Sequence, residues 1–144
     1  MTMVTEAPMS ARPNDTDLFA GCRPKELAAI SRLYTEMAVA PRRVLLREGE
    51  PSGQFLVITA GSAQVEMGSK PIGIVSAGSF VGELSLIDGG ACIATVTAIT
   101  PMHLLVFGPS EFEALMNLEI RSVMRRMLHT VARRLRATDA LHGS

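Results

Sequence analysis

Short β-rich segments separated by glycines fill the middle of the chain, between Met37 and Gly108. They are Val44–Leu46, Phe55–Ile58, Ala63–Val65, Ile72–Val75, Ile93–Val96 and Leu104–Phe107. Short strands with a turn about every 8 to 12 residues are typical of a closed or two-sheet antiparallel barrel. We therefore expect roughly eight short strands, and the candidate turn residues are Gly49, Gly61, Gly78 and Gly82.

Helical periodicity replaces the strand pattern on both sides of this region. Before it, apolar residues recur at helical spacing between Leu18 and Leu33, and Pro24 suits a first helical turn, which predicts a short helix there. After Pro109, a short helix carrying Phe112, Leu115 and Met116 is expected. A longer helix follows, with an apolar stripe of Ile120, Val123, Met124, Met127, Leu128, Val131 and Leu135.

Composition points to one globular domain. The chain has 144 residues, of which 47% are hydrophobic, and its mean hydropathy is +0.26. Its formal net charge is zero, so no overall field attracts nucleic acid or an anionic membrane. Cys22 and Cys92 form no C-x-x-C pair, and the N-terminus lacks the features of a secretory signal, which indicates a cytoplasmic protein. Residues 1–17 are aperiodic, and we expect them to be a disordered leader.

One segment carries a family resemblance. Residues 82–96 read Gly-Glu-Leu-Ser-Leu-Ile-Asp-Gly-Gly-Ala-Cys-Ile-Ala-Thr-Val, which resembles the phosphate-binding cassette of cyclic nucleotide-binding domains. Residues 47–50 and 55–65 look like the opening half of the β-roll of that family. The resemblance covers residues 18 to about 141. It implies a mainly β fold, an antiparallel β-roll of the double-stranded jelly-roll type, as in the catabolite activators, with a short N-terminal helix and C-terminal helices of the B and C type.

The resemblance also implies a set of ligand-binding positions. Gly82, Glu83, Leu84 and Ser85 match residues at which the glutamate accepts a hydrogen bond from a ribose 2′-hydroxyl and backbone amides point at the phosphate. Thr138 matches a threonine that reaches the adenine amino group. The residues alone allow other roles, because Glu83 suits a capping carboxylate at a helix N-terminus and Thr138 a helix-surface threonine.

The cassette departs from the family pattern at two positions. Cys92 and Ile93 stand where the family has an arginine, which pairs with the phosphate, and a small or hydroxyl residue. A charge-assisted bond of that kind contributes about 1.5 to 3 kcal/mol, so its loss predicts about ten- to hundredfold weaker affinity. No lysine or arginine lies between Lys70 and Arg121. An anionic ligand would then rest on backbone amides, or on a cation from Lys70 or from the long helix.

Together these observations predict a non-enzymatic regulatory module that binds cAMP and cGMP weakly or not at all, with cAMP favoured over cGMP. The alternatives are a ligand-free interaction domain on a degenerate β-roll, and a regulatory domain detached from a larger enzyme, transporter or transcription factor. Residues 120–138 suit a homodimer seam, formed by Met124, Leu128, Val131, Leu135 and Thr138. The arginines of this helix are interpreted as a solvated face rather than a nucleic-acid site.

Sites of other kinds find little support in the sequence. His103, His129 and His142 lack the spacing of metal ligands, and neither a P-loop nor a Gly-x-Ser-x-Gly elbow occurs. We expect no catalytic residue, no metal, no nucleic-acid partner and no membrane partner. The folded domain is expected to span residues 18–141, without a DNA-binding domain.

Overall fold

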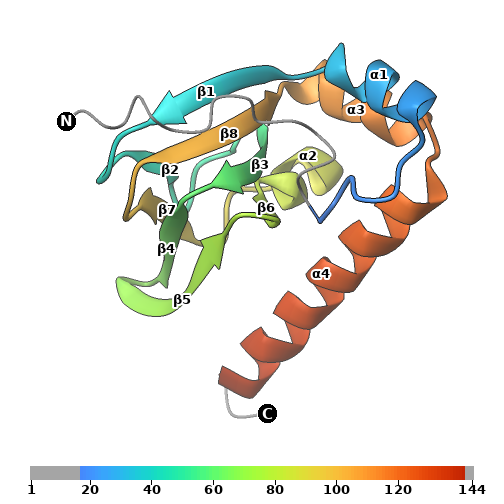
Figure 1. Cartoon of the computed structure of the whole chain (residues 1–144). Helices are drawn as coiled ribbons and strands as arrows, with labels where there is room; N and C mark the ends of the chain where they lie inside the picture. The colour runs from blue at the N-terminus through green and yellow to red at the C-terminus, as the bar shows by residue number, and fades with distance from the viewer. Residues whose placement is uncertain (1–16, 142–144) are drawn as a thin grey trace.

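Two antiparallel four-stranded sheets form the body of the protein, in a computed structural model that describes residues 17–141, with side chains to residue 137 (Figure 1). The first sheet has the order β1 (Thr35–Val39), β8 (Met102–Phe107), β3 (Phe55–Ala60), β6 (Phe80–Val81). The second has the order β2 (Val44–Leu46), β7 (Thr95–Ala98), β4 (Ser62–Met67), β5 (Lys70–Ser76). Among the described residues this is the predicted β-roll, with the expected eight strands.

The two central strands of the first sheet are buried on both faces. Successive side chains of a strand point to opposite sides, so Phe55 and Val57 of β3 pack toward the helices while Leu56 and Ile58 pack between the sheets. The neighbouring strand β8 divides its side chains in the same way and is buried at every position. The result is two apolar clusters, a helix-side core and an inter-sheet core, joined through one pair of strands.

Some of the observed strands were not predicted, and others begin or end at different residues than predicted. β1 and β6 were not predicted, and β7 begins at Thr95, so Ile93 and Ala94 lie in a loop rather than in the predicted strand. The backbone of this loop pairs elsewhere: the N–H of Cys92 donates to the carbonyl of Glu50 at 2.8 Å, and the N–H of Gly49 donates to the carbonyl of Cys92 at 2.9 Å. The four candidate turn glycines all have positive φ, between 90° and 96°.

The N-terminal helix is shorter than predicted. Leu18 and Phe19 lie in a turn rather than a helix, and α1 spans only Pro24–Ser31. The side chain of Glu26 accepts a hydrogen bond from the N–H of Arg23 at 2.8 Å, which fixes the helix start after the turn. Leu18 and Phe19 are nevertheless buried in the helix-side core. Their apolar character therefore indicated burial correctly and helix incorrectly.

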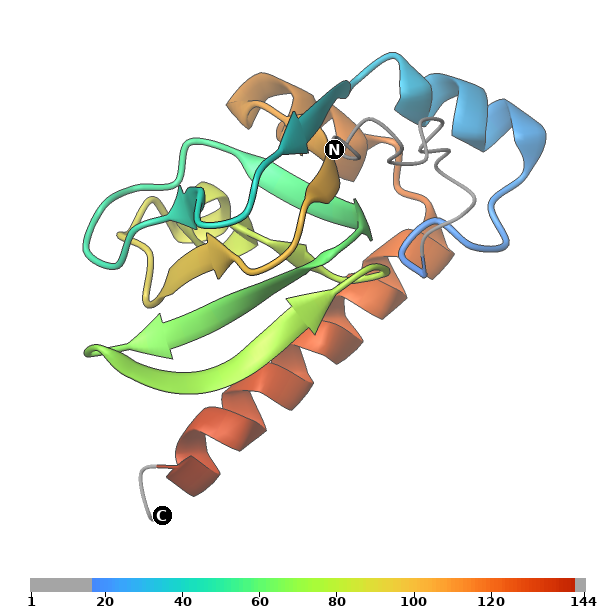
Figure 2. The ribbon, with the colours of Figure 1, turned by 60° about the vertical axis from the view of Figure 1, so that its left-hand side comes forward.

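The C-terminal part is helical as predicted. α3 spans Pro109–Asn117 and α4 spans Arg121–Leu141. Figures 1 and 2 show α4 leaving the helical end of the roll and running past the β4–β5 hairpin. Its predicted apolar stripe divides into two parts. Val123 and Met127 are buried in the helix-side core, whereas Leu128 and Leu135 are 70% and 63% exposed.

Candidate functional site

A tight backbone crossing positions the start of the cassette. Gly82 follows β6 and has a φ of 93°, which favours glycine. A Cβ at this position would lie 2.3 Å from the carbonyl oxygen of Gln54. Helix α2 (Glu83–Asp88) begins directly after it. Gly82 is therefore required by a neighbouring backbone segment, and this crossing sets the direction in which Glu83 leaves the strand.

Glu83 is a buried carboxylate, with 3% of the residue exposed. Its Oε2 atom lies 3.5 Å from Nη1 of Arg134, which belongs to α4. Burial raises the pKa of Glu83, while the charge of Arg134 and a hydrogen bond from its own backbone N–H act to lower it. The principal partner of this carboxylate thus comes from a helix far along the chain, in addition to the helix-start role considered from the sequence.

Arg134 is held against the cassette by several contacts. Its Nη2 donates to Oγ of Ser79 at 2.8 Å and to the carbonyl oxygen of Phe80 at 2.5 Å. The guanidinium carbon also lies 5.0 Å from the centre of the Phe80 ring, a cation–π distance. The side chain is 34% exposed, and burial lowers its pKa against the opposing effect of Glu83. Arg134 is therefore fixed in place and still reaches solvent.

Sequence reasoning missed Arg134 as a site residue, although a signal was present. Residues seven and eleven positions apart lie on one face of a helix, and Arg134 is seven residues after Met127 and eleven after Val123. Both of those residues are buried against the roll. The face of α4 that packs on the body therefore continues to Arg134, which distinguishes it from the other arginines of the helix.

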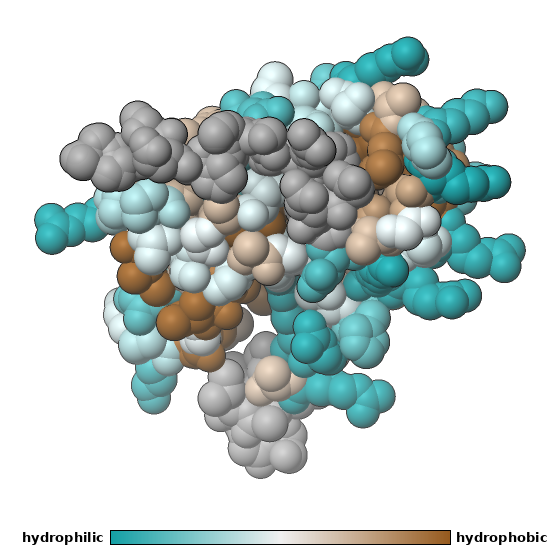
Figure 3. All heavy atoms as spheres, viewed as in Figure 1, coloured by the Kyte–Doolittle hydropathy of each residue, from teal (hydrophilic) through white to brown (hydrophobic). Residues whose placement is uncertain are grey.

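A cleft of about 1080 Å³ lies between the roll and α4. Figure 3 shows this hollow, with brown apolar surface on the roll side and teal polar surface on the helix side. Its lining includes Val65, Met67, Ile72, Ile74 and Val75 of strands β4 and β5. Ile74 is 63% exposed, so the cleft presents an uncovered apolar wall.

The cleft brings together six of the predicted site residues. They are Gly82, Glu83, Leu84, Ser85, Cys92 and Ile93. Oγ of Ser85 lies 3.7 Å from Sγ of Cys92, and both residues are buried, whereas Ile93 is 55% exposed. Thr138 lies in α4, but its side chain is outside the described residues, so its adenine contact stays a prediction.

Positive charge in the cleft comes from one side. The lysine and arginine residues among its described lining are Arg125, Arg126, Arg133 and Arg134, all from α4. Lys70, the other cation considered from the sequence, is not among the lining residues. The acidic residues of the lining are Asp17 and Glu83. The cleft therefore has an apolar wall, a floor formed by the cassette and a basic helix wall.

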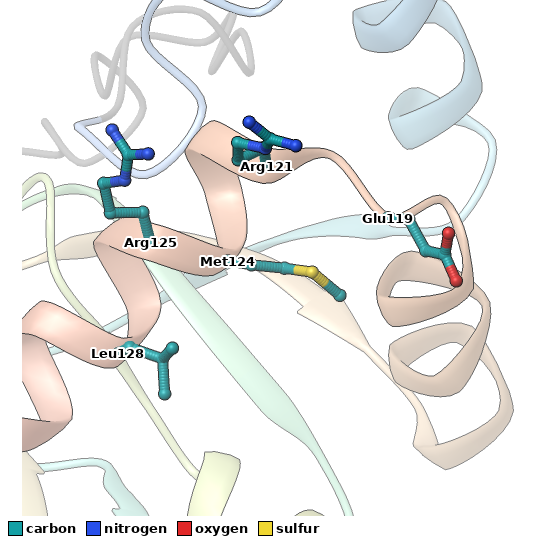
Figure 4. A pocket seen from close by; sticks show the side chains of 5 residues that line it. All are labelled: Glu119, Arg121, Met124, Arg125 and Leu128. Atoms are coloured by element: carbon teal, nitrogen blue, oxygen red, sulfur yellow. The ribbon is translucent and has the colours of Figure 1, made fainter.

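A second, smaller hollow of about 500 Å³ lies on another side of α4. Figure 4 shows Met124 and Leu128 pointing to the same side of the helix, with Glu119 of the link between α3 and α4 nearby. Arg121 and Arg125 complete the lining. Met124 and Leu128 belong to the seam predicted for a dimer. This apolar strip is separate from the cassette, which lies on the cleft side of the helix.

Two structural features expected of other protein classes are not found in the described part of the chain. Across residues 17–141, no cluster of three or more histidine, cysteine or acidic residues is arranged to hold a metal ion. Within the same range, no helix combines the length and apolar character that a membrane crossing requires.

Several known proteins are similar to this chain in sequence or in fold. The acetyltransferase Pat of Mycolicibacterium smegmatis is 28% identical over 125 residues, which are 84% of this chain and 37% of that protein. The N-terminal domain of a transcriptional regulator from Streptomyces coelicolor A3(2) is 30% identical, with a TM-score of 0.64, covering 89% of this chain and 94% of that one. A PKAR CBD2 structure bound to Sp-2Cl-cAMPS has a TM-score of 0.75 at 19% identity, covering 87% and 83% of the two chains.

These relatives carry the domain in different settings. Because this chain spans only about a third of the acetyltransferase, that protein's activity is not transferred to it. The matched domain itself is a non-catalytic regulatory module. Residues 36–119, which hold the strands of the roll and the cassette, match the family described as "Cyclic nucleotide-binding domain". This chain belongs to the cyclic nucleotide-binding domain family.

Proposed function

We propose that this domain is a regulatory sensor whose ligand occupies the cleft between the β-roll and α4, and that it binds cAMP and cGMP weakly or not at all. The observation that carries the proposal is the chemistry of the cleft floor. The cassette contributes the buried thiol of Cys92 and the aliphatic side chain of Ile93, and the cleft-lining cations described above all belong to α4. A phosphodiester placed on the floor lacks the arginine that the family pattern supplies there.

The output of such a sensor would be the position of α4. This helix forms one wall of the cleft and contacts the cassette through the pair between Arg134 and Glu83. A ligand that contacts both the floor and α4 differs in its interaction energy between helix positions, and that difference is what shifts a conformational equilibrium. The domain would thus act without catalysis of its own, by altering what α4 presents to a partner or to the rest of a larger protein.

Calorimetric titration of the chain with cAMP and cGMP tests this proposal. We expect a dissociation constant weaker than micromolar, with cAMP the tighter of the two ligands. The double variant Cys92→Arg with Ile93→Ser restores the family pattern and should tighten cAMP binding about ten- to hundredfold. The matched control is Cys92→Gln with Ile93→Ser, which changes the polarity of the floor without adding charge. Micromolar or tighter binding by the unaltered chain, or an inert arginine variant, would contradict the proposal.

A second candidate function is a ligand-free dimerisation domain, in which the degenerate roll serves as a scaffold. The observation in its favour is the exposure of Leu128, at 70%, on the strip of α4 that also carries Met124. Sedimentation equilibrium decides between the two. A homodimer through residues 120–138 should dissociate on Leu128→Glu and persist in the control His129→Glu, which alters an exposed neighbour. A concentration-independent monomer would remove this candidate.

A further inference from the structure

Any anion that enters the cleft meets an unusual distribution of charge. The apolar strands β4 and β5 line one wall, and the floor offers the carboxylate of Glu83 and the thiol of Cys92. The described cations of the lining lie on α4. Among them, Arg134 pairs with Glu83 of the cassette and also contacts Ser79 and Phe80, which precede the cassette. Arg133, its neighbour in sequence, lines the cleft as well and is exposed.

We propose that Arg134 supplies the anion contact of this cleft in place of a cassette residue, so that Glu83 and Arg134 together bind a phosphate ester with a hydroxyl on the adjacent carbon. The inference rests on the proposed function and specifies how the ligand is held. A 3′,5′-cyclic nucleotide has this arrangement, because its 2′-hydroxyl neighbours the 3′-phosphate ester. The carboxylate of Glu83 accepts a hydrogen bond from the hydroxyl, and Arg134 donates a hydrogen bond to a phosphate oxygen.

The geometry of the pair suits such a ligand. Oε2 of Glu83 and Nη1 of Arg134 are 3.5 Å apart, so an acceptor and a cationic donor lie side by side. In a 3′,5′-cyclic nucleotide the 2′-hydroxyl neighbours the phosphate that is attached at the 3′ position, so the hydroxyl and a charged phosphate oxygen can face these two groups together. A carboxylate hydrogen-bonds a hydroxyl, and a guanidinium hydrogen-bonds phosphate oxygens with defined directions. A ligand that contacts Arg134 therefore lies beside the carboxylate of Glu83, whose side chain is 4% exposed.

Arg134 is also pre-organised for this role. The hydrogen bonds to Ser79 and Phe80 and the stacking on the Phe80 ring fix the plane of its guanidinium. Fixing the orientation in advance reduces the entropy lost on binding. Because the carboxylate of Glu83 already neutralises part of its charge, the ligand must share the arginine with Glu83. The expected affinity is therefore lower than that of an arginine without an acidic neighbour, in agreement with weak binding.

Placing the cation on α4 couples binding to helix position directly. If a cassette arginine held the phosphate, the charge of the ligand would be satisfied within the roll. With Arg134 in that role, the hydrogen bond that holds the phosphate also joins the ligand to α4. This hydrogen bond can form only when α4 lies against the roll. Ligand binding therefore favours the docked position of α4.

Titration of ¹⁵N-labelled protein with cAMP, followed by NMR chemical shifts, tests the proposal. We expect Arg134→Ala to weaken cAMP binding at least about tenfold, since a charge-assisted bond is lost. Arg134→Lys keeps the positive charge but loses the planar guanidinium, and it should weaken cAMP binding about threefold. The matched control Arg136→Ala should change affinity by less than about twofold, because this exposed arginine of α4 is not among the residues that line the cleft.

A ligand variant provides a test that does not depend on folding of a mutant. With the unaltered chain, 2′-deoxy-cAMP should bind several-fold more weakly than cAMP, because the carboxylate of Glu83 then lacks its hydroxyl donor. In Arg134→Ala the same deletion should matter less, since the two contacts act through one pair. Thermal unfolding of each variant identifies any loss of fold, and in that case Arg134→Lys and the deoxy ligand decide the result.

The possible outcomes separate this inference from the proposed function. Unchanged or tighter cAMP binding by Arg134→Ala would overturn it and identify the arginine as a latch that ligand displaces. No shift with the unaltered chain at about 10 mM cAMP, together with binding by Cys92→Arg/Ile93→Ser, would overturn the role of Arg134 and leave the proposed function standing. No binding by either protein would overturn both.

Discussion

The β-roll and α4 form opposite sides of the cleft and are built on different principles. Strands β3 and β8 are covered on one face by helices and on the other by the second sheet. Helix α4 packs on the body along one face only, through Val123, Met127 and Arg134, and leaves Leu128 and Leu135 exposed. The shape of the cleft floor therefore depends on the two packed cores of the roll. The positive charge of the cleft depends instead on a helix that packs on the body along one face.

The largest effect should come from the roll. Phe55→Ala is expected to lower the free energy of unfolding by about 4 kcal/mol, because a fully buried ring is replaced by a cavity. Phe55 lies 5.0 Å to 5.5 Å from the rings of Phe80, Phe107 and Phe112, so the loss spreads through the helix-side core. Urea denaturation measures it. The control Ile74→Ala, at a 63% exposed position, should cost less than about 0.5 kcal/mol.

A backbone change at the junction of roll and cassette should rank next. Gly82→Ala is expected to cost about 2 to 3 kcal/mol, because the added Cβ meets the Gln54 carbonyl at 2.3 Å and φ is 93°. Gly89→Ala shares a positive φ, at 74°, but has open space around its Cβ. It should cost only about 1 kcal/mol. Equal losses in the two variants, measured by thermal unfolding, would show that the crossing can relax.

Within α4, the two parts of the apolar stripe should respond differently. Met127→Ala removes a side chain that is 5% exposed and should cost about 2 kcal/mol. Leu128→Ala alters the adjacent residue, which is 70% exposed, and should cost less than about 0.5 kcal/mol in the monomer. Denaturant unfolding at low protein concentration makes this comparison. A large loss from Leu128→Ala that appears only at high concentration would indicate a dimer.

The smallest expected effect is a dependence on pH at the contact between the two regions. Burial raises the pKa of Glu83, so the folded state binds its proton more readily than the unfolded state does. Stability tied to the protonated form is present at low pH and is lost as the pH rises through the raised pKa. As the pH rises from below the ordinary glutamate pKa through the raised pKa of Glu83, the unfolding free energy of Glu83→Gln should therefore rise relative to that of the unaltered chain. A difference independent of pH would contradict the direction of this shift.

The sequence predicted the roll better than the helix wall, for a physical reason. Strands between glycine turns are local features, and Gly49, Gly61, Gly78 and Gly82 mark four of the turns at positive φ. The cassette motif likewise placed Glu83 and Cys92 on one cleft surface, because short loops keep neighbours in sequence close in space. Local patterns were enough for these features.

Residues outside the predictions depend on contacts between distant segments. Arg134 lies about fifty residues from Glu83, and its choice among the α4 arginines follows from how the helix docks on Phe80. Ile93 leaves its expected strand because the backbone of Cys92 bonds with residues 49 and 50 instead. Leu18 is buried from within a turn, since the core selects apolar side chains regardless of the local conformation. In each case, contacts between distant segments determine the position of the residue, and the local sequence pattern does not.

The loop near the end of the cassette is held to residues 49 and 50 by two hydrogen bonds between backbone atoms. Both of its hydrogen bonds use main-chain atoms of Cys92, so the course of the loop does not depend on which side chain stands there. The side chain of Cys92 has a separate role, because it is buried in the inter-sheet core and lies beside Ser85. The path of the loop can therefore be kept when the side chain at position 92 is exchanged, and the cost of the exchange falls on the packing around that side chain.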